Sequence, residues 1–307
     1  MRKANGTAMH DIPFVDAHIH LWDLALLRYP WLTPPFADDG PSGSVAAIAH
    51  SYLPADYRAD AARWNVIGAV HIDAGADPGD ALAETEWLER QAAATGLPTA
   101  IVAYAALDDA EVESLLAAHI RNPRVRGIRQ IVNWHAEPSR TYTPRDVTVD
   151  PAWERGFALL AKYGLSFDLQ CYPGQMAGLA RLIARYPEVP VMINHAGMPV
   201  DPDLAEWRDG MDALAALPNV AVKLSGFGFV ERSWTTDRIR PLVLGVIETF
   251  GVARCMFASD FPTDKLFGSF DRHLEAYHAI VADFPLDERK KLFGANANRL
   301  YRLGLPE

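Results

Sequence analysis

The sequence predicts an α/β fold, a (β/α)8 TIM barrel that forms a single domain over residues 1–307. Three observations lead to this prediction. Eight short apolar runs occur along the chain, and sequence of helical pattern follows each of them. A chain of 307 residues has the length that eight βα units require. No GxGxxG or GxxxxGKS/T motif follows any run, which counts against a doubly wound nucleotide-binding fold.

The predicted strands are rich in Val, Ile and Ala, as expected when both faces of a parallel sheet are buried. They cover residues 14–20, 66–73, 99–105, 125–132, 165–170, 189–195, 220–225 and 255–260. The predicted helices cover residues 56–63, 80–95, 111–119, 153–163, 175–186, 204–216, 239–250, 270–282 and 288–303. Gly96, Gly164 and Gly251 end three of these helices.

The first strand ends in two histidines, His18 and His20, spaced i, i+2. Side chains alternate across a strand, so we expect Asp16, His18 and His20 on one face. Two imidazoles at the carboxyl end of a strand suit a metal ion or an anionic substrate.

A long segment at residues 21–52 separates the first strand from the first helix. Pro34-Pro35 and Asp38-Asp39-Gly40 interrupt any helix there. The segment is too long for a plain connection, so we predict a functional loop over the active-site face. Trp31 and Phe36 are either structural plugs of this loop or part of a pocket.

Polar side chains stand at the carboxyl ends of seven of the eight predicted strands, where (β/α)8 barrels carry their chemistry. They are His18 and His20, His71 and Asp73, Arg129 and Gln130, Gln170, Asn194 and His195, Lys223 and Ser225, and Ser259 and Asp260. Closure of a barrel makes the eighth strand a neighbour of the first, so we expect Asp260 to meet His18 and His20. A carboxylate beside two imidazoles either completes a metal site or acts as a general base.

The other residues near the strand ends are candidates for substrate binding. Arg129 is suited to bidentate recognition of a carboxylate or carbonyl, or else forms a structural ion pair. The further candidates are Asp73, Gln170, Lys223 and the aromatic residues Trp31, Trp134 and Tyr172. We expect the helical histidines His119, His273 and His278 on the surface.

Composition excludes several function classes. A formal net charge of −10 argues against a nucleic-acid partner and against an anionic membrane surface. Cys171 and Cys255 lie far apart, which indicates neither a disulfide framework nor a thiolate metal site. Without an apolar signal segment, the sequence is typical of a cytoplasmic enzyme with a small-molecule substrate. The oligomeric state, including a homo-oligomer, stays open.

Several motifs together resemble the amidohydrolase superfamily, and within it the amidohydrolase-2 branch of sugar-lactone and pyrone-dicarboxylate lactonases. They are Phe14-Val-Asp-Ala-His-Ile-His-Leu-Trp-Asp23, Arg28-Tyr-Pro-Trp-Leu32, Gly127-Ile-Arg129, Ile193-Asn-His-Ala-Gly-Met-Pro199, Val222-Lys-Leu-Ser-Gly226, Phe257-Ala-Ser-Asp-Phe-Pro262 and Gly294-Ala-Asn-Ala-Asn-Arg-Leu-Tyr301. The resemblance covers nearly the whole chain.

The resemblance implies hydrolysis of a lactone ring, either of a sugar aldonolactone or of a dicarboxylate lactone. Asp260 would be the base that activates water, and His195 would contact the carbonyl. His18 and His20 would form the first-strand motif. An alternative on the same scaffold is a metal-dependent decarboxylase, and a third reading is a non-catalytic binding barrel.

The chain departs from the metal-rich pattern of the superfamily at two strand ends. The fourth strand ends in Arg129-Gln130, with no lysine to bridge two metals, and the fifth ends in Gln170 where the pattern has a histidine. These departures argue against a binuclear site. Two alternatives stay open: one divalent ion, zinc or manganese, held by His18, His20 and Asp260, and a metal-independent site.

Overall fold

The computed structural model describes residues 9–36 and 43–306, and its core is an eight-stranded parallel sheet with the strand order β1 to β8. The strands are β1 (Phe14–Ile19), β2 (Val66–Ile72), β3 (Ala100–Tyr104), β4 (Val125–Ile131), β5 (Ser166–Gln170), β6 (Val191–Ile193), β7 (Val220–Leu224) and β8 (Cys255–Phe257). Three backbone contacts between β1 and the chain after β8 close the barrel: Asp260 N–H donates to His18 O at 2.8 Å, His20 N–H donates to Phe261 O at 2.8 Å, and Ile19 bridges Phe261. The predicted (β/α)8 barrel is confirmed.

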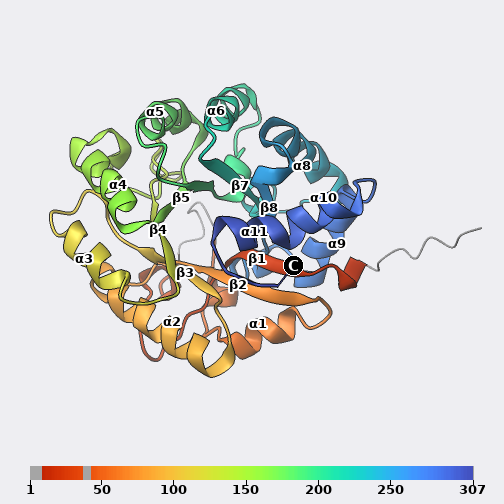
Figure 1. Ribbon diagram of the computed structural model, residues 1–307, viewed down its shortest axis with the longest axis horizontal. Helices are drawn as coiled ribbons and strands as arrows, with labels where there is room; N and C mark the ends of the chain where they lie inside the picture. The colour runs from red at the N-terminus through yellow and green to blue at the C-terminus, as the bar shows by residue number, and fades with distance from the viewer. Residues whose placement is uncertain (1–8, 37–42, 307) are drawn as a thin grey trace, which may run out of the picture.

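A ring of helices surrounds the strands (Figure 1). The helices are α1 (Pro54–Asp60), α2 (Ala81–Thr95), α3 (Val112–His119), α4 (Pro151–Tyr163), α5 (Pro173–Ile183), α6 (Ala205–Ala215), α7 (Phe227–Val230), α8 (Thr236–Phe250), α9 (Phe270–Ile280), α10 (Leu286–Lys290) and α11 (Asn296–Leu300). Gly96 and Gly164 end α2 and α4 in the left-handed conformation that glycine adopts without strain. These two helix ends agree with the predicted stop signals.

Two hydrophobic cores sit on the two faces of the sheet. The larger core lies between the strands and the helices, whereas a smaller core fills the barrel interior and includes Val15, Ala17 and Met256. Tyr301, just after α11, belongs to this interior core, and its hydroxyl donates to Asp168 Oδ2 at 2.9 Å. The carboxyl-terminal helix thereby closes the end of the barrel opposite the carboxyl ends of the strands.

β6 and β8 are shorter than the sequence predicts. Each was expected to run to a polar residue, His195 or Asp260, but β6 ends at Ile193 and β8 at Phe257. His195 and Asp260 have positive φ angles of 53° and 56°, which no strand accommodates. The segment predicted as one helix over residues 288–303 divides into α10, a π-helical segment (Lys291–Ala295) and α11.

Asp16 does not share a face of β1 with His18 and His20, so that prediction is wrong. The pairing of β1 with β2 shifts register between Asp16 and Ile19, which breaks the two-residue alternation. Val15 and Ala17 face the barrel interior, while Asp16 accepts a hydrogen bond from the hydroxyl of Tyr57 on the outer helix α1 at 2.9 Å. The irregularity is what lets His18 face the interior together with His20, whose Nε2 atoms lie 3.2 Å apart.

The expectation of surface positions for three helical histidines is also wrong, because all three pack on the inner faces of their helices. His119, His273 and His278 are buried. His119 bonds to Thr85 Oγ1 and the Tyr104 carbonyl, and His278 stacks on Phe293 with ring centroids 3.9 Å apart. The side of each helix that packs against the barrel is buried, and these histidines lie on that side.

The predicted loop at residues 21–52 contains two short 3-10 turns, Pro30–Leu32 and Ala46–Ile48. Its Asp38-Asp39-Gly40 portion lies outside the described residues. In the described part of the chain, no helix has the length and apolar character needed to cross a bilayer.

Candidate active site

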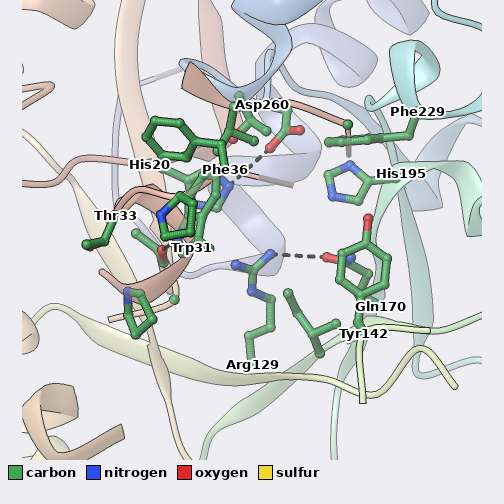
Figure 2. A pocket seen from close by; sticks show the side chains of 18 residues that line it. His20, Trp31, Thr33, Phe36, Arg129, Tyr142, Gln170, His195, Phe229 and Asp260 are labelled. Atoms are coloured by element: carbon green, nitrogen blue, oxygen red, sulfur yellow. Dashed lines mark hydrogen bonds and ion pairs between the residues drawn. The ribbon is translucent and has the colours of Figure 1, made fainter. Parts of the chain in front are cut away.

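A cavity of about 450 Å³ opens at the carboxyl ends of the strands. His20, Arg129, Gln170, His195 and Asp260 line it, each from the end of a different strand (Figure 2). All five side chains are at least nine-tenths buried. The structure therefore brings together in one space residues that are separated by up to 240 positions in the sequence.

His18, His20 and Asp260 form a tight triangle at the floor of this cavity. Oδ1 of Asp260 lies 3.3 Å from Nε2 of His18 and 3.1 Å from Nε2 of His20. Nδ1 of His20 donates to the Ile72 carbonyl at 2.8 Å, because a carbonyl oxygen can only accept. The second carboxylate oxygen, Oδ2, has no hydrogen-bond partner among the described residues.

The electrostatics keep Asp260 ionised. Burial by itself raises the pKa of this carboxyl, but His195, His20 and Arg129 together outweigh burial and hold the pKa below its ordinary value. Burial lowers the pKa of His195 to about 4 and the pKa of His18 well below its usual range. At neutral pH the site thus combines a carboxylate with neutral imidazoles at His18 and His195.

His195 lies in a strained backbone segment that follows β6. His195, Ala196 and Met198 all have φ near 50°, a region that residues with a Cβ atom rarely adopt. The imidazole packs on Gly226, where a Cβ atom would lie only 2.5 Å from Nδ1. Of the five described non-glycine residues with positive φ, four lie at or beside His195 and Asp260, as expected for a functional site.

Arg129 on β4 is held by two partners at once. Its Nε donates to Asp73 Oδ2 at 3.3 Å, its second terminal nitrogen donates to the Asp73 carbonyl, and its first donates to Gln170 Oε1 at 3.2 Å. Both roles predicted for Arg129 are therefore compatible with its position. It forms an ion pair with Asp73 on one side and faces the cavity on the other.

Comparison with known proteins agrees with this geometry. A sequence model described as "Amidohydrolase" matches residues 15–303. The chain belongs to the amidohydrolase family. This amidohydrolase is 44% identical over 302 residues to uncharacterized protein y4mH of Sinorhizobium fredii, covering 96% of this chain and 100% of that one. It is also 29% identical to an L-fucono-1,5-lactonase of Burkholderia ambifaria, with 95% and 96% of the two chains covered.

A solved structure extends the comparison. An amidohydrolase from Burkholderia multivorans with bound zinc superposes with a TM-score of 0.79 at 25% identity, covering 95% of this chain and 99% of that one. The resemblance inferred from the sequence motifs is thereby confirmed, and this amidohydrolase is an enzyme of the hydrolase class.

The triangle of His18, His20 and Asp260 fits one divalent metal ion. Its three donor atoms are 3.1–3.3 Å apart. Tetrahedral zinc with bonds of about 2.0–2.1 Å sets neighbouring ligands about 3.3–3.4 Å apart. Nδ1 of His20 donates to the Ile72 carbonyl, so in the neutral form of this ring Nε2 offers a lone pair to a cation. The described residues contain one such group of potential ligands, and Gln170 binds Arg129 instead of joining it.

Four predicted substrate-binding residues of this amidohydrolase do not line the cavity: Lys223, Tyr172, Trp134 and Asp73. Lys223 is fully buried beneath His18, with Nζ 2.6 Å from Asp168 Oδ2 and 3.4 Å from His18 Nδ1. Tyr172 and Trp134 line a neighbouring cavity of about 290 Å³. Asp73 lies behind Arg129 and forms an ion pair with its guanidinium at 3.3 Å.

The aromatic lining was found only in part from the sequence. Trp31 and Phe36 from the long loop line the cavity, and Trp31 is fixed by a bond from Nε1 to the Ala74 carbonyl at 2.8 Å. Tyr142, in the connection after β4, and Phe229, on α7, also line it and were missed. Their positions in connections that leave strand ends were the one signal that could have indicated them.

Proposed function

We propose that this amidohydrolase hydrolyses a small lactone, with Asp260 as the general base. The observation that supports the proposal most directly is the placement of Asp260. Its carboxylate lines the cavity, stays ionised, and has one oxygen without a partner in the described part of the chain. A carboxylate in that state can accept a proton from water.

In the proposed reaction, Asp260 takes a proton from a water molecule while the oxygen of that water forms a bond to the lactone carbonyl carbon. His195 and Arg129 lie on the cavity wall, where they can donate hydrogen bonds to the carbonyl oxygen as it becomes negatively charged. The ring carbon–oxygen bond then breaks, and the leaving alkoxide takes the proton back from Asp260. The product is the open-chain hydroxy acid.

A divalent ion bound by His18, His20 and Asp260 would supply Lewis-acid polarisation of water or carbonyl. The remaining steps rely on the residues of the chain itself. The similar amidohydrolase from Burkholderia multivorans was crystallised with bound zinc, which supports a divalent ion in this amidohydrolase.

Within the lactones, we propose a sugar lactone over a dicarboxylate lactone. Among the described lining residues, Arg129 is the only Lys or Arg, and Asp73 already neutralises it. A second carboxylate on the ligand would lack a cation, and burying an unpaired charge is costly. Aromatic walls such as Trp31 and Phe229 suit stacking against a sugar ring. The similarity to an L-fucono-1,5-lactonase supports the same choice.

The decarboxylase alternative has less support. It requires a metal ligand at the end of β5. The residue there is Gln170, whose Oε1 accepts a hydrogen bond from Arg129 at 3.2 Å instead of facing a metal ion.

A pH-indicator screen of aldonolactones and dicarboxylate lactones, with and without chelator, tests the proposal. Asp260→Asn should reduce kcat by about 10²–10⁴-fold with an unchanged circular dichroism spectrum, because the amide cannot accept the proton. Asp283→Asn, at an exposed position outside the cavity, is the matched control. Wild-type activity in Asp260→Asn would remove the assignment.

A further inference from the structure

The side chain of Ser225, at the end of β7, contacts the ring of His195 and is fully buried. Ser225 Oγ lies 3.2 Å from His195 Nδ1. No other described residue bonds to this hydroxyl. The direction of this one hydrogen bond decides what the imidazole presents to the substrate.

Two arrangements of the pair are chemically possible. If Nδ1–H donated to Ser225 Oγ, the hydroxyl hydrogen of Ser225 would remain without an acceptor among the described residues. A buried polar group without a hydrogen-bond partner destabilises the arrangement that contains it. If the hydroxyl donates to Nδ1, both groups are satisfied. The second arrangement is therefore the stable one.

A neutral imidazole carries a single ring hydrogen, so an accepting Nδ1 places that hydrogen on Nε2. Nδ1 is occupied by Ser225, which leaves Nε2 for the cavity that His195 lines. A carbonyl oxygen, and the oxyanion formed from it, can only accept. The Nε2–H form can stabilise it, whereas the Nδ1–H form would present a lone pair to a developing negative charge.

We propose that Ser225 is a positioning residue that holds His195 in the Nε2–H tautomer, so that the ring donates to the oxyanion of the substrate. The oxyanion part rests on the proposed lactone hydrolysis, whereas the tautomer does not.

The test combines a spectroscopic and a kinetic readout. In protein labelled with ¹⁵N-histidine, the side-chain nitrogen shifts report the tautomer directly, and the His195→Asn spectrum assigns the signals of that ring. We expect the wild-type ring to show Nε2–H alone. Ser225→Ala should show both tautomers and a kcat lowered about 3- to 10-fold with KM little changed, because the donor acts on the transition state. Ser225→Thr keeps the hydroxyl and should recover both readouts.

Ser166→Ala is the matched control. Ser166 begins β5 and is also a buried serine of a barrel strand, but its hydroxyl donates to the Arg126 carbonyl on β4, away from the cavity. This variant should leave the His195 signals and kcat unchanged.

Three results would overturn the proposal. They are an Nδ1–H ring in the wild-type protein, an unchanged tautomer and kcat in Ser225→Ala, and an equal kinetic loss in Ser166→Ala. A wild-type protein inactive on every lactone would refute the proposed function, while its nitrogen spectrum would still decide the tautomer. If Ser225→Ala does not fold, the wild-type spectrum and Ser225→Thr carry the test.

Discussion

Gly226→Ala should lower kcat about 10²-fold by displacing His195. Gly226 has φ of +68°, so any Cβ atom there is strained, at about 1–2 kcal/mol for a left-handed residue. In addition, the new Cβ would lie 2.5 Å from Nδ1 and 2.6 Å from Cγ of His195. Carbon–carbon contacts are favourable only near 3.5–4.0 Å, so the ring must move by about 1 Å. Misplacement of a catalytic group by about 1 Å lowers the rate by about 10²-fold.

Gly164→Ala separates the two effects. Gly164 ends α4 with φ of +62°, and a Cβ atom there would meet nothing within 4 Å. This variant should share the strain, and hence a fall in Tm of a few degrees, but keep the wild-type kcat and KM. Melting curves and steady-state kinetics on the two variants and the wild type provide the comparison. Normal kinetics in Gly226→Ala, or an equal loss in Gly164→Ala, would refute the packing argument.

Three further predictions concern the rest of the site. Arg129→Lys keeps the charge but loses the planar guanidinium, so kcat/KM should fall about 10- to 150-fold with a nearly unchanged Tm. If Arg129→Met instead shows a large fall in Tm and normal kinetics, Arg129 has only a structural role. Elemental analysis after dialysis should find at most one divalent ion per chain, because Gln170 is engaged by Arg129, and two ions would contradict this. kcat/KM should stay level as the pH falls from 7 toward 4, because the pKa of Asp260 is held below its ordinary value and the pKa of His195 is about 4. Activity should be lost once Asp260 takes up a proton and can no longer act as the base, so a loss centred near pH 6.5 would contradict the assignment.

Local sequence pattern determined the fold. Short β-branched runs that alternate with amphipathic helices have few alternatives to a closed parallel barrel, since each element must bury a face. The same pattern indicated the edge at which the chemistry lies, because the strand ends of a parallel barrel all meet on one side. His18, His20, His195 and Asp260 were therefore identified as candidates without any coordinates, and the structure places them together.

Only the tertiary structure decided which way the individual side chains face. The irregularity in β1 sends Asp16 outward to Tyr57 and lets both His18 and His20 face inward. At this point β1 pairs on one side with β2 and on the other with the chain after β8, about 240 residues away in the sequence. A two-residue alternation rule contains no information about that pairing.

Burial and partner choice were likewise decided by packing. Lys223 could have reached the cavity from the end of β7, but Asp168 on the neighbouring interior wall holds it beneath His18. His119 and His278 lie in helices whose polar residues looked exposed, yet the stripe that faces the barrel includes them. A sequence states which residues a strand or helix contains, whereas the depth and the partner of each side chain depend on neighbours that only the closed barrel brings into contact.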